Sequence, residues 1–206
     1  MIEKQYSRPE FPAVFESLLD IHRAQSQSLK LFRRSAPELV DVLSLSFDKG
    51  GNSVLTDGYL VSGSLNEAVR EYAYGHGIFA QLLDDMEDVE QDNRAGRLTV
   101  YSEQVGNGSL DALVNRTFHF GRKVLTGLEC FEVEESVREL IRRGADLLLI
   151  DTISRTDRYY TAAYLRELEA HSPFNFSFLN KQRNDFFQRH GSLLKLMETD
   201  MSFQSY

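Results

Sequence analysis

Apolar residues recur at helical spacing along most of the chain, whereas the strict alternation typical of strands is scarce. The four prolines stand at positions 9, 12, 37 and 173, so none interrupts a helix between residues 38 and 172. No internal repeat, low-complexity tract or linker divides the sequence. The pattern therefore predicts an all-α fold in a single domain that spans residues 1–206.

The helices can be placed approximately from this spacing and from the breakers between them. A helical pattern covers about residues 11–47, in which Pro37 either starts a new helix or kinks the old one. Residues 48–53, with two glycines and an asparagine, have the chemistry of a turn. Residues 64–67, Ser-Leu-Asn-Glu, form a capping-box sequence, which predicts a helix that reaches Val89 and stops near Gly96. Further helices are expected at about 109–129, 134–170 and 177–198.

Composition and charge limit the classes of protein to which this chain can belong. Apolar residues make up 42% of the chain and charged residues 26%, which is ordinary for a soluble globular protein. A net charge of −8 argues against a nucleic-acid binder, because phosphate backbones require a basic surface. The lone cysteine, Cys130, excludes an intramolecular disulfide and fits a reducing compartment. With no signal peptide and no apolar run long enough for a transmembrane segment, the expected location is cytoplasmic.

Four aspartates mark one side of the predicted helix that contains Gln81. At about 100° per residue, Asp84, Asp85, Asp88 and Asp92 fall within a sector of roughly 100°. Like charges at these spacings repel by a few tenths of a kcal/mol per pair, on the order of 0.2–0.5. A solvated acidic face is one interpretation. The other is a site for Mg²⁺, which prefers carboxylate and phosphate oxygens and would offset the repulsion.

Residues 74–88, Tyr-Gly-His-Gly-Ile-Phe-Ala-Gln-Leu-Leu-Asp-Asp-Met-Glu-Asp, resemble the second aspartate-rich region of trans-prenyl diphosphate synthases. That family has a glycine, a short apolar stretch, a glutamine, two residues and then Asp-Asp-x-x-Asp. Residues 96–99, Gly-Arg-Leu-Thr, resemble the family's Gly-Lys-x-Thr that follows, and residues 27–32, Gln-Ser-Leu-Lys-Leu-Phe, resemble its Lys-Thr-x-x-Leu-Phe. The resemblance covers about residues 20–100 and implies a helical bundle of the isoprenoid-synthase type.

The resemblance also implies roles for the matched residues. Asp84, Asp85 and Asp88 would ligate Mg²⁺ and act in catalysis. The substrate, an allylic prenyl diphosphate, would be contacted by Gln81, Arg97, Gln27 and Lys30. The implied reaction is prenyl transfer or terpene cyclisation. Two departures accompany the match: Gln27 stands where the family has a lysine, unless Lys30 takes that place, and Ala80 rather than Phe79 precedes Gln81.

The family's first aspartate-rich region has no counterpart in this chain. Only 83 residues precede Asp84, and they contain no paired aspartates. The resemblance therefore implies a partial fold without its N-terminal helices, completed by a homo- or hetero-oligomeric partner or by sequence absent here. The alternative is a non-catalytic helical subunit or pseudo-enzyme that regulates or assembles with a partner. Residues 158–159, Arg-Tyr, also resemble a diphosphate-gripping pair of some terpene cyclases, although the favoured interpretation of so short a motif is a plain surface arginine beside packed tyrosines.

Overall fold

The computed structural model describes residues 2–32 and 41–202, and within these ranges it is helical, without a strand. The prediction of an all-α fold is thereby confirmed. The α-helices are α1 (Ile2–Gln5), α2 (Pro12–Ser28), α3 (Val42–Ser62), α4 (Glu67–Glu87), α5 (Val89–Ala95), α6 (Val100–Gln104), α7 (Asp111–Thr126), α8 (Glu135–Arg155), α9 (Ala162–His171) and α10 (Phe176–Ser202). Short 3-10 helices are η1 (Leu29–Leu31), η2 (Gly127–Cys130) and η3 (Asp157–Tyr159).

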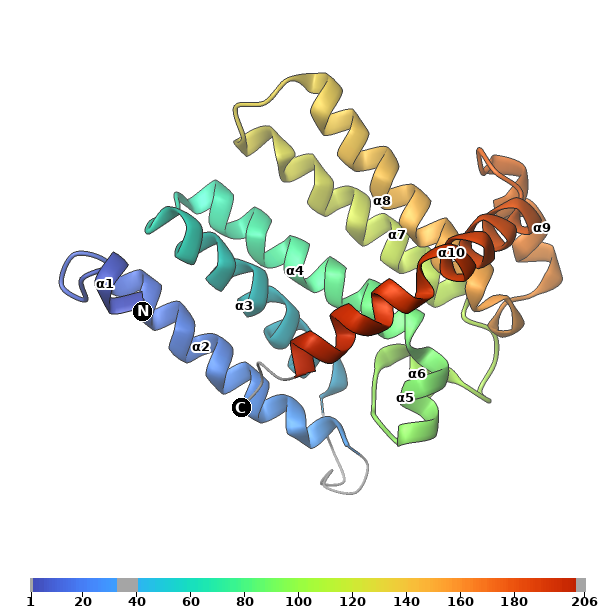
Figure 1. Ribbon diagram of the computed structural model, residues 1–206, viewed down its shortest axis with the longest axis horizontal. Helices are drawn as coiled ribbons and strands as arrows, with labels where there is room; N and C mark the ends of the chain where they lie inside the picture. The colour runs from blue at the N-terminus through green and yellow to red at the C-terminus, as the bar shows by residue number, and fades with distance from the viewer. Residues whose placement is uncertain (1, 33–40, 203–206) are drawn as a thin grey trace.

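The long helices lie side by side in a row, in which α2 packs on α3, α3 on α4, and α4 on α7 and α8 (Figure 1). The neighbouring helices α2, α3 and α4 run antiparallel to one another (Figure 1), and the short connection 63–66 joins α3 to α4, as is usual in helical bundles. The short helices α5 and α6 lie at the C-terminal end of α4. The C-terminal helix α10 contacts α8, where Arg183 pairs with Asp151.

Three glycines, Gly50, Gly51 and Gly77, allow α3 and α4 to approach closely. A Cβ atom on Gly77 would lie 2.1 Å from the backbone oxygen of Gly50, and a Cβ on Gly51 would lie 2.5 Å from the Tyr74 ring. The prediction of a turn at residues 48–53 is therefore wrong. These residues lie inside α3, where Gly50 and Gly51 allow close packing against α4. The hydroxyl of Tyr74 donates to Asp48 Oδ1 at 3.0 Å across the same contact.

The helix that carries the aspartates begins and ends differently from the prediction. Its N-cap is Asn66, whose side chain accepts from the Val69 N–H, so the predicted capping box of Ser64 with Glu67 is wrong. Asn66, two residues after Ser64, is an equally good N-cap by residue type, and the helix begins directly after it. The helix ends at Glu87, and after Asp88 the chain continues as α5. Gly96, with φ of 70°, ends α5 at the predicted position.

Two other long helices of the prediction are shorter in the structure. The segment predicted as helix over 11–47 contains α2 and η1, which end by Leu31, and the start of α3; Pro37 lies outside the described residues. The segment 134–170 is divided into α8 and α9 by η3 and the Thr161 N-cap. Helical periodicity persists through such joints, because the apolar side chains still face one core. The predicted stop before Pro173 is confirmed, since α9 ends at His171.

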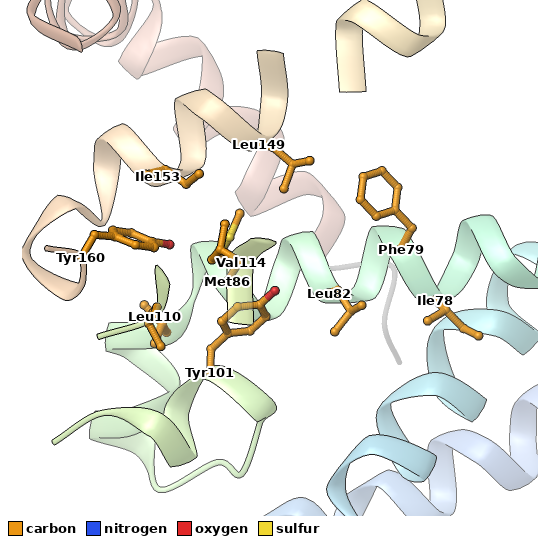
Figure 2. Close-up of a cluster of buried hydrophobic side chains, with 11 residues drawn as sticks. Ile78, Phe79, Leu82, Met86, Tyr101, Leu110, Val114, Leu149, Ile153 and Tyr160 are labelled. Carbon is orange, nitrogen blue, oxygen red and sulfur yellow. The ribbon is translucent and has the colours of Figure 1, made fainter. Parts of the chain in front are cut away.

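The main core lies between α4, α7 and α8 (Figure 2). Met86 and Val114 are fully buried, and Leu149 and Ile153 of α8 close the cluster. Tyr101 of α6 reaches into it and shares a 2.5 Å hydrogen bond with the Thr117 hydroxyl. A second, smaller cluster of Tyr6, Val14 and Tyr59 holds α1 and α2 on α3.

Candidate functional site

A small polar cavity lies where α3, η1 and the residues after α5 meet the C-terminal half of α4. It encloses about 10 Å³, which is room for about one water molecule. Its lining is mostly polar and comes from four separate segments: Ser28, Leu31, Ser46, Lys49, Gln81, Asp85, Arg97 and Thr99. The term "polar cavity" refers to this set of residues below.

Backbone contacts bring these segments together. Gly96 turns the chain in the left-handed conformation, and the Arg97 N–H then donates to the Asp92 carbonyl at 2.9 Å. The Leu98 N–H donates to the Leu31 carbonyl at 2.6 Å, and Arg97 forms an isolated antiparallel bridge with Phe32. The Arg97 guanidinium also lies over the Phe32 ring, 5.4 Å from its centroid. Residues 96–99 are thereby fixed against η1.

Asp85 lies in the interior at the polar cavity. It is 4% exposed, and Gln81 donates to its Oδ1 at 2.7 Å, whereas its Oδ2 has no hydrogen-bond partner among the described residues. The pKa of the Asp85 carboxyl is raised to about 6, mainly by burial and in smaller part by the nearby charges of Asp92 and Asp84. The Gln81 hydrogen bond and the Lys49 ammonium act in the opposite direction.

Asp92 of α5 is the second buried carboxyl. It is also 4% exposed, Arg97 Nη1 lies 3.7 Å from its Oδ1, and its Oδ2 has no hydrogen-bond partner among the described residues. Burial raises the pKa of Asp92, and Arg97 counteracts this shift. Asp88 and Asp84 raise the same pKa by repulsion. Two cationic side chains, Lys49 and Arg97, therefore face two buried carboxyls in this part of the molecule.

Asp84 and Asp88 are placed differently. Asp84 is exposed and Asp88 is partly exposed, and neither forms an ion pair with a residue that the structure describes. Burial raises the pKa of Asp88, as do the neighbouring charges of Asp84 and Glu87; Arg97 and Arg155 lower it. The three predicted metal ligands thus divide into an interior Asp85 and an outward-facing pair, one helical turn apart. Within residues 2–32 and 41–202, no group of three or more His, Cys, Asp or Glu side chains is gathered to hold a metal ion.

The predicted substrate-binding residues are also divided. Gln81 and Arg97 line the polar cavity, and the Arg97 side chain remains partly exposed. Gln27 and Lys30 lie on the surface, while their neighbours Ser28 and Leu31 face inward. The lysine-to-glutamine departure at position 27 therefore falls on an exposed position outside the polar cavity.

The Arg-Tyr pair lies beside the outer aspartates. Arg158 forms an ion pair with Glu90 of α5 and donates to the Tyr159 hydroxyl at 2.8 Å. Arg155 forms ion pairs with Glu87 and Asp151. An open groove of about 600 Å³ adjoins them, and its lining residues, charged or polar apart from one alanine, are Glu87, Asp88, Glu90, Gln91, Arg94 and Ala95.

Sequence reasoning missed Lys49, Ser46 and Thr99. The role of Lys49 was not predicted because residues 48–53 have the chemistry of a turn. In the structure these residues belong to α3, and the charge of Lys49 acts on Asp85 and Asp92. Thr99 was noted only as part of a motif. In the structure its side chain caps α6 by accepting from the Ser102 N–H at 3.0 Å, and the Ser102 hydroxyl in turn accepts from the Thr99 N–H.

Comparison of the sequence with protein-family models and curated proteins, and of the fold with solved structures, finds no match. None of the helices in the described ranges has the length and apolarity that a membrane crossing requires.

Proposed function

We propose that the chain is a class I isoprenoid-synthase-like protein that binds an allylic prenyl diphosphate through Mg²⁺ for prenyl transfer or terpene cyclisation. The observation that carries the proposal is spatial. Residues 27–32, 74–88 and 96–99, which resemble segments of trans-prenyl diphosphate synthases, meet at one end of α4. The last two are close along the chain, but residues 27–32 are remote in sequence, and a coincidental match of short motifs gives no reason for them to lie there.

The outward-facing pair, Asp84 and Asp88, fits Mg²⁺. The ion is usually held by one or two carboxylates, substrate phosphates and several waters, and needs no cage of protein ligands. Two carboxylates one turn apart, without an ion pair to any described residue, meet that requirement. A cation there would also relieve the repulsion by Asp84 and Glu87 that contributes to the raised pKa of Asp88.

The other residues act through position and charge. When bound, Mg²⁺ neutralises the diphosphate and makes it a leaving group. Arg97 is partly exposed and offers a guanidinium, which pairs bidentately with phosphate oxygens. Asp85, with Gln81 hydrogen-bonded to it, is buried where the outer pair is not, and it supports α4 from the interior. We therefore assign ligation to Asp84 and Asp88, and a supporting role to Asp85.

A second candidate is a non-catalytic helical subunit that assembles with a partner. Two observations favour it. The groove beside Asp88 is lined by charged and polar side chains, which do not shelter a prenyl chain. The polar cavity at Gln81 and Asp85 has room for about one water molecule and not for a substrate. In the first candidate the family's first aspartate cluster would come from a partner chain or from sequence absent here.

The test of binding is isothermal titration of the chain with an allylic prenyl diphosphate in the presence of Mg²⁺. We expect saturable heat that disappears when Mg²⁺ is replaced by a chelator. Asp84→Asn and Asp88→Asn should each weaken binding at least about tenfold, or about 1.4 kcal/mol, because each removes a carboxylate from the cation. The matched control is Asp57→Asn, an exposed aspartate on α3, which should bind as the unaltered chain does. No heat in any of these titrations would remove the proposal.

A turnover assay separates the two candidates. Release of inorganic diphosphate from the prenyl diphosphate is measured for the chain alone and after mixing with a protein that carries the other aspartate cluster. Release that requires the partner and is lost in Asp84→Asn supports a split enzyme. Binding without release in either mixture supports the non-catalytic subunit.

A further inference from the structure

The backbone of Arg97 is held by two buried residues. Its N–H donates to the Asp92 carbonyl at 2.9 Å, and its carbonyl accepts from the Ser102 hydroxyl at 2.8 Å. Asp92 is 4% exposed and Ser102 is 1% exposed. Gly96, in the left-handed conformation, makes the turn that brings Arg97 back to the end of α5. The Arg97 side chain therefore extends from a fixed point, although residues 96–99 lie between two helices.

The Arg97 side chain is restrained as well. Its Nη1 lies 3.7 Å from Asp92 Oδ1, and its guanidinium lies over the Phe32 ring, 5.4 Å from the centroid. A buried carboxylate and an aromatic face each attract a cation, so together they favour one placement of the guanidinium. Asp92 thus contacts Arg97 twice, at the main chain through its carbonyl and at the guanidinium through its carboxylate.

The restrained guanidinium is still accessible to a ligand. The Arg97 side chain is 37% exposed, whereas that of Asp92 is 6% exposed. At 3.7 Å the contact with Asp92 is longer than a hydrogen bond, which leaves the N–H donors of the guanidinium available. The charge of Arg97 also lowers the pKa of Asp88, so it acts on the outward-facing pair as well as on the buried carboxyl.

We propose that Asp92 is a positioning residue, which together with the Phe32 ring holds the Arg97 guanidinium ready for the diphosphate. The Asp92 carboxylate acts through Arg97 and not on the ligand, because its side chain is buried. This inference rests on the proposed function, since it needs a diphosphate that binds beside Asp84 and Asp88. It adds a residue to which neither the Asp-Asp-x-x-Asp motif nor the Gly-Arg-Leu-Thr segment assigns a role.

Charge and positioning predict opposite effects of Asp92 on binding. As a negative charge near the site, Asp92 repels a diphosphate, so its removal should tighten binding. As a positioning residue, it orders Arg97 before the ligand arrives. A long side chain that becomes ordered only on binding weakens the affinity about 2–10-fold, so removal of Asp92 should weaken binding. The sign of the effect therefore decides between the two roles.

Isothermal titration of the full chain with inorganic diphosphate in the presence of Mg²⁺ measures that sign. Arg97→Gln should weaken binding at least about tenfold, because it removes hydrogen bonds from a charged donor. Asp92→Asn, which keeps the shape of the side chain and removes its charge, should weaken binding about 2–10-fold. The same ratios are expected with an allylic prenyl diphosphate, because both ligands share the diphosphate. The matched control is Asp146→Asn, because Asp146 also pairs with an arginine, Arg122, at 3.2 Å; it should bind as the unaltered chain does.

A double variant tests whether Asp92 acts through Arg97. With Arg97→Gln already present, Asp92→Asn should leave binding unchanged or tighten it, because no guanidinium remains to be positioned. A general structural defect would weaken binding in both backgrounds. Phe32→Leu should weaken binding about 2–5-fold through loss of the cation–π contact. Circular dichroism verifies that each variant is folded, and Phe32→Leu, at a position that is 38% exposed, carries the test if Asp92→Asn does not fold.

Three outcomes would overturn the positioning role. The first is binding that is unchanged or tighter in Asp92→Asn while Asp84→Asn still weakens it, which leaves the proposed function standing. The second is an equal loss of affinity on Asp92→Asn with and without Arg97. The third is normal binding by a folded Phe32→Leu variant if Asp92→Asn does not fold. If the unaltered chain binds neither inorganic diphosphate nor an allylic prenyl diphosphate, the proposed function and this inference fall together.

Discussion

Residue by residue, the aspartates of α4 and α5 differ more in surroundings than their motif suggests. Helical projection places Asp84, Asp85, Asp88 and Asp92 on one side of a helix, and to that extent the sequence predicted their proximity. It did not predict that Asp85 and Asp92 would be buried while Asp84 stays exposed. That division depends on the approach of α3 and of residues 96–99, which are remote in sequence.

The buried carboxyl of Asp85 makes stability depend on pH. Its pKa is about 6 in the folded chain, against an ordinary value of 3.8. The folded state binds this proton more tightly than the unfolded state, so the contribution of Asp85 to the free energy of unfolding is fully present below pH 3.8 and is lost as pH rises through 6. The full shift corresponds to about 3 kcal/mol, of which about 1.4 kcal/mol is lost between pH 5 and pH 8. Urea unfolding at pH 5 and pH 8, without divalent cations, measures that part.

Asp85→Asn should remove most of this difference between the two pH values, because the amide does not ionise. The control Asp57→Asn should retain it, since Asp57 is an exposed aspartate on α3. An unchanged difference in Asp85→Asn would assign the pH dependence to another group.

At the scale of elements, the contact between α3 and α4 decides where the site residues lie. Gly50 and Gly77 bring the two backbones together, and Lys49 of α3 then faces Asp85 of α4. Local chemistry alone favours a turn at residues 48–53, so the sequence pattern concealed both the helix and the lysine. By contrast, Gly96 ended α5 as predicted, because its left-handed conformation is a local property. A helix end that depends on a single residue was therefore predictable, whereas the residues that meet through the close packing of α3 and α4 were not.

Gly77→Ala should destabilise the chain by about 1–3 kcal/mol, because its Cβ would lie 2.1 Å from a backbone oxygen of α3 and the helices must separate. Thermal or urea unfolding measures the change. The matched control is Gly191→Ala in α10, where a Cβ meets no heavy atom within 4 Å among the described residues. That substitution should be neutral or stabilising by up to about 1 kcal/mol. Equal effects of the two substitutions would contradict the packing role of Gly77.

For the molecule as a whole, the apolar side chains form two unequal clusters. The larger one joins α4, α7 and α8, and the smaller one, of Tyr6, Val14 and Tyr59, holds α1 and α2 on α3. Segments with fewer buried contacts open at lower free energy than the rest of a protein. The sequence predicted apolar helical faces along α2, α4, α7 and α8, but the division into two clusters depends on which faces meet in space.

Native-state hydrogen exchange should therefore show α2 opening before α4 and α7. Val14 is fully buried in the smaller cluster, so Val14→Ala should lower the opening free energy of α2 by about 2 kcal/mol and speed its exchange about 30-fold. The amides of α7 should change little. Met86→Ala, in the larger cluster, should speed exchange in both regions, because it lowers the global free energy of unfolding. If Val14→Ala accelerated α2 and α7 equally, the two clusters would be one cooperative unit, and α2 would unfold only together with the site on α4.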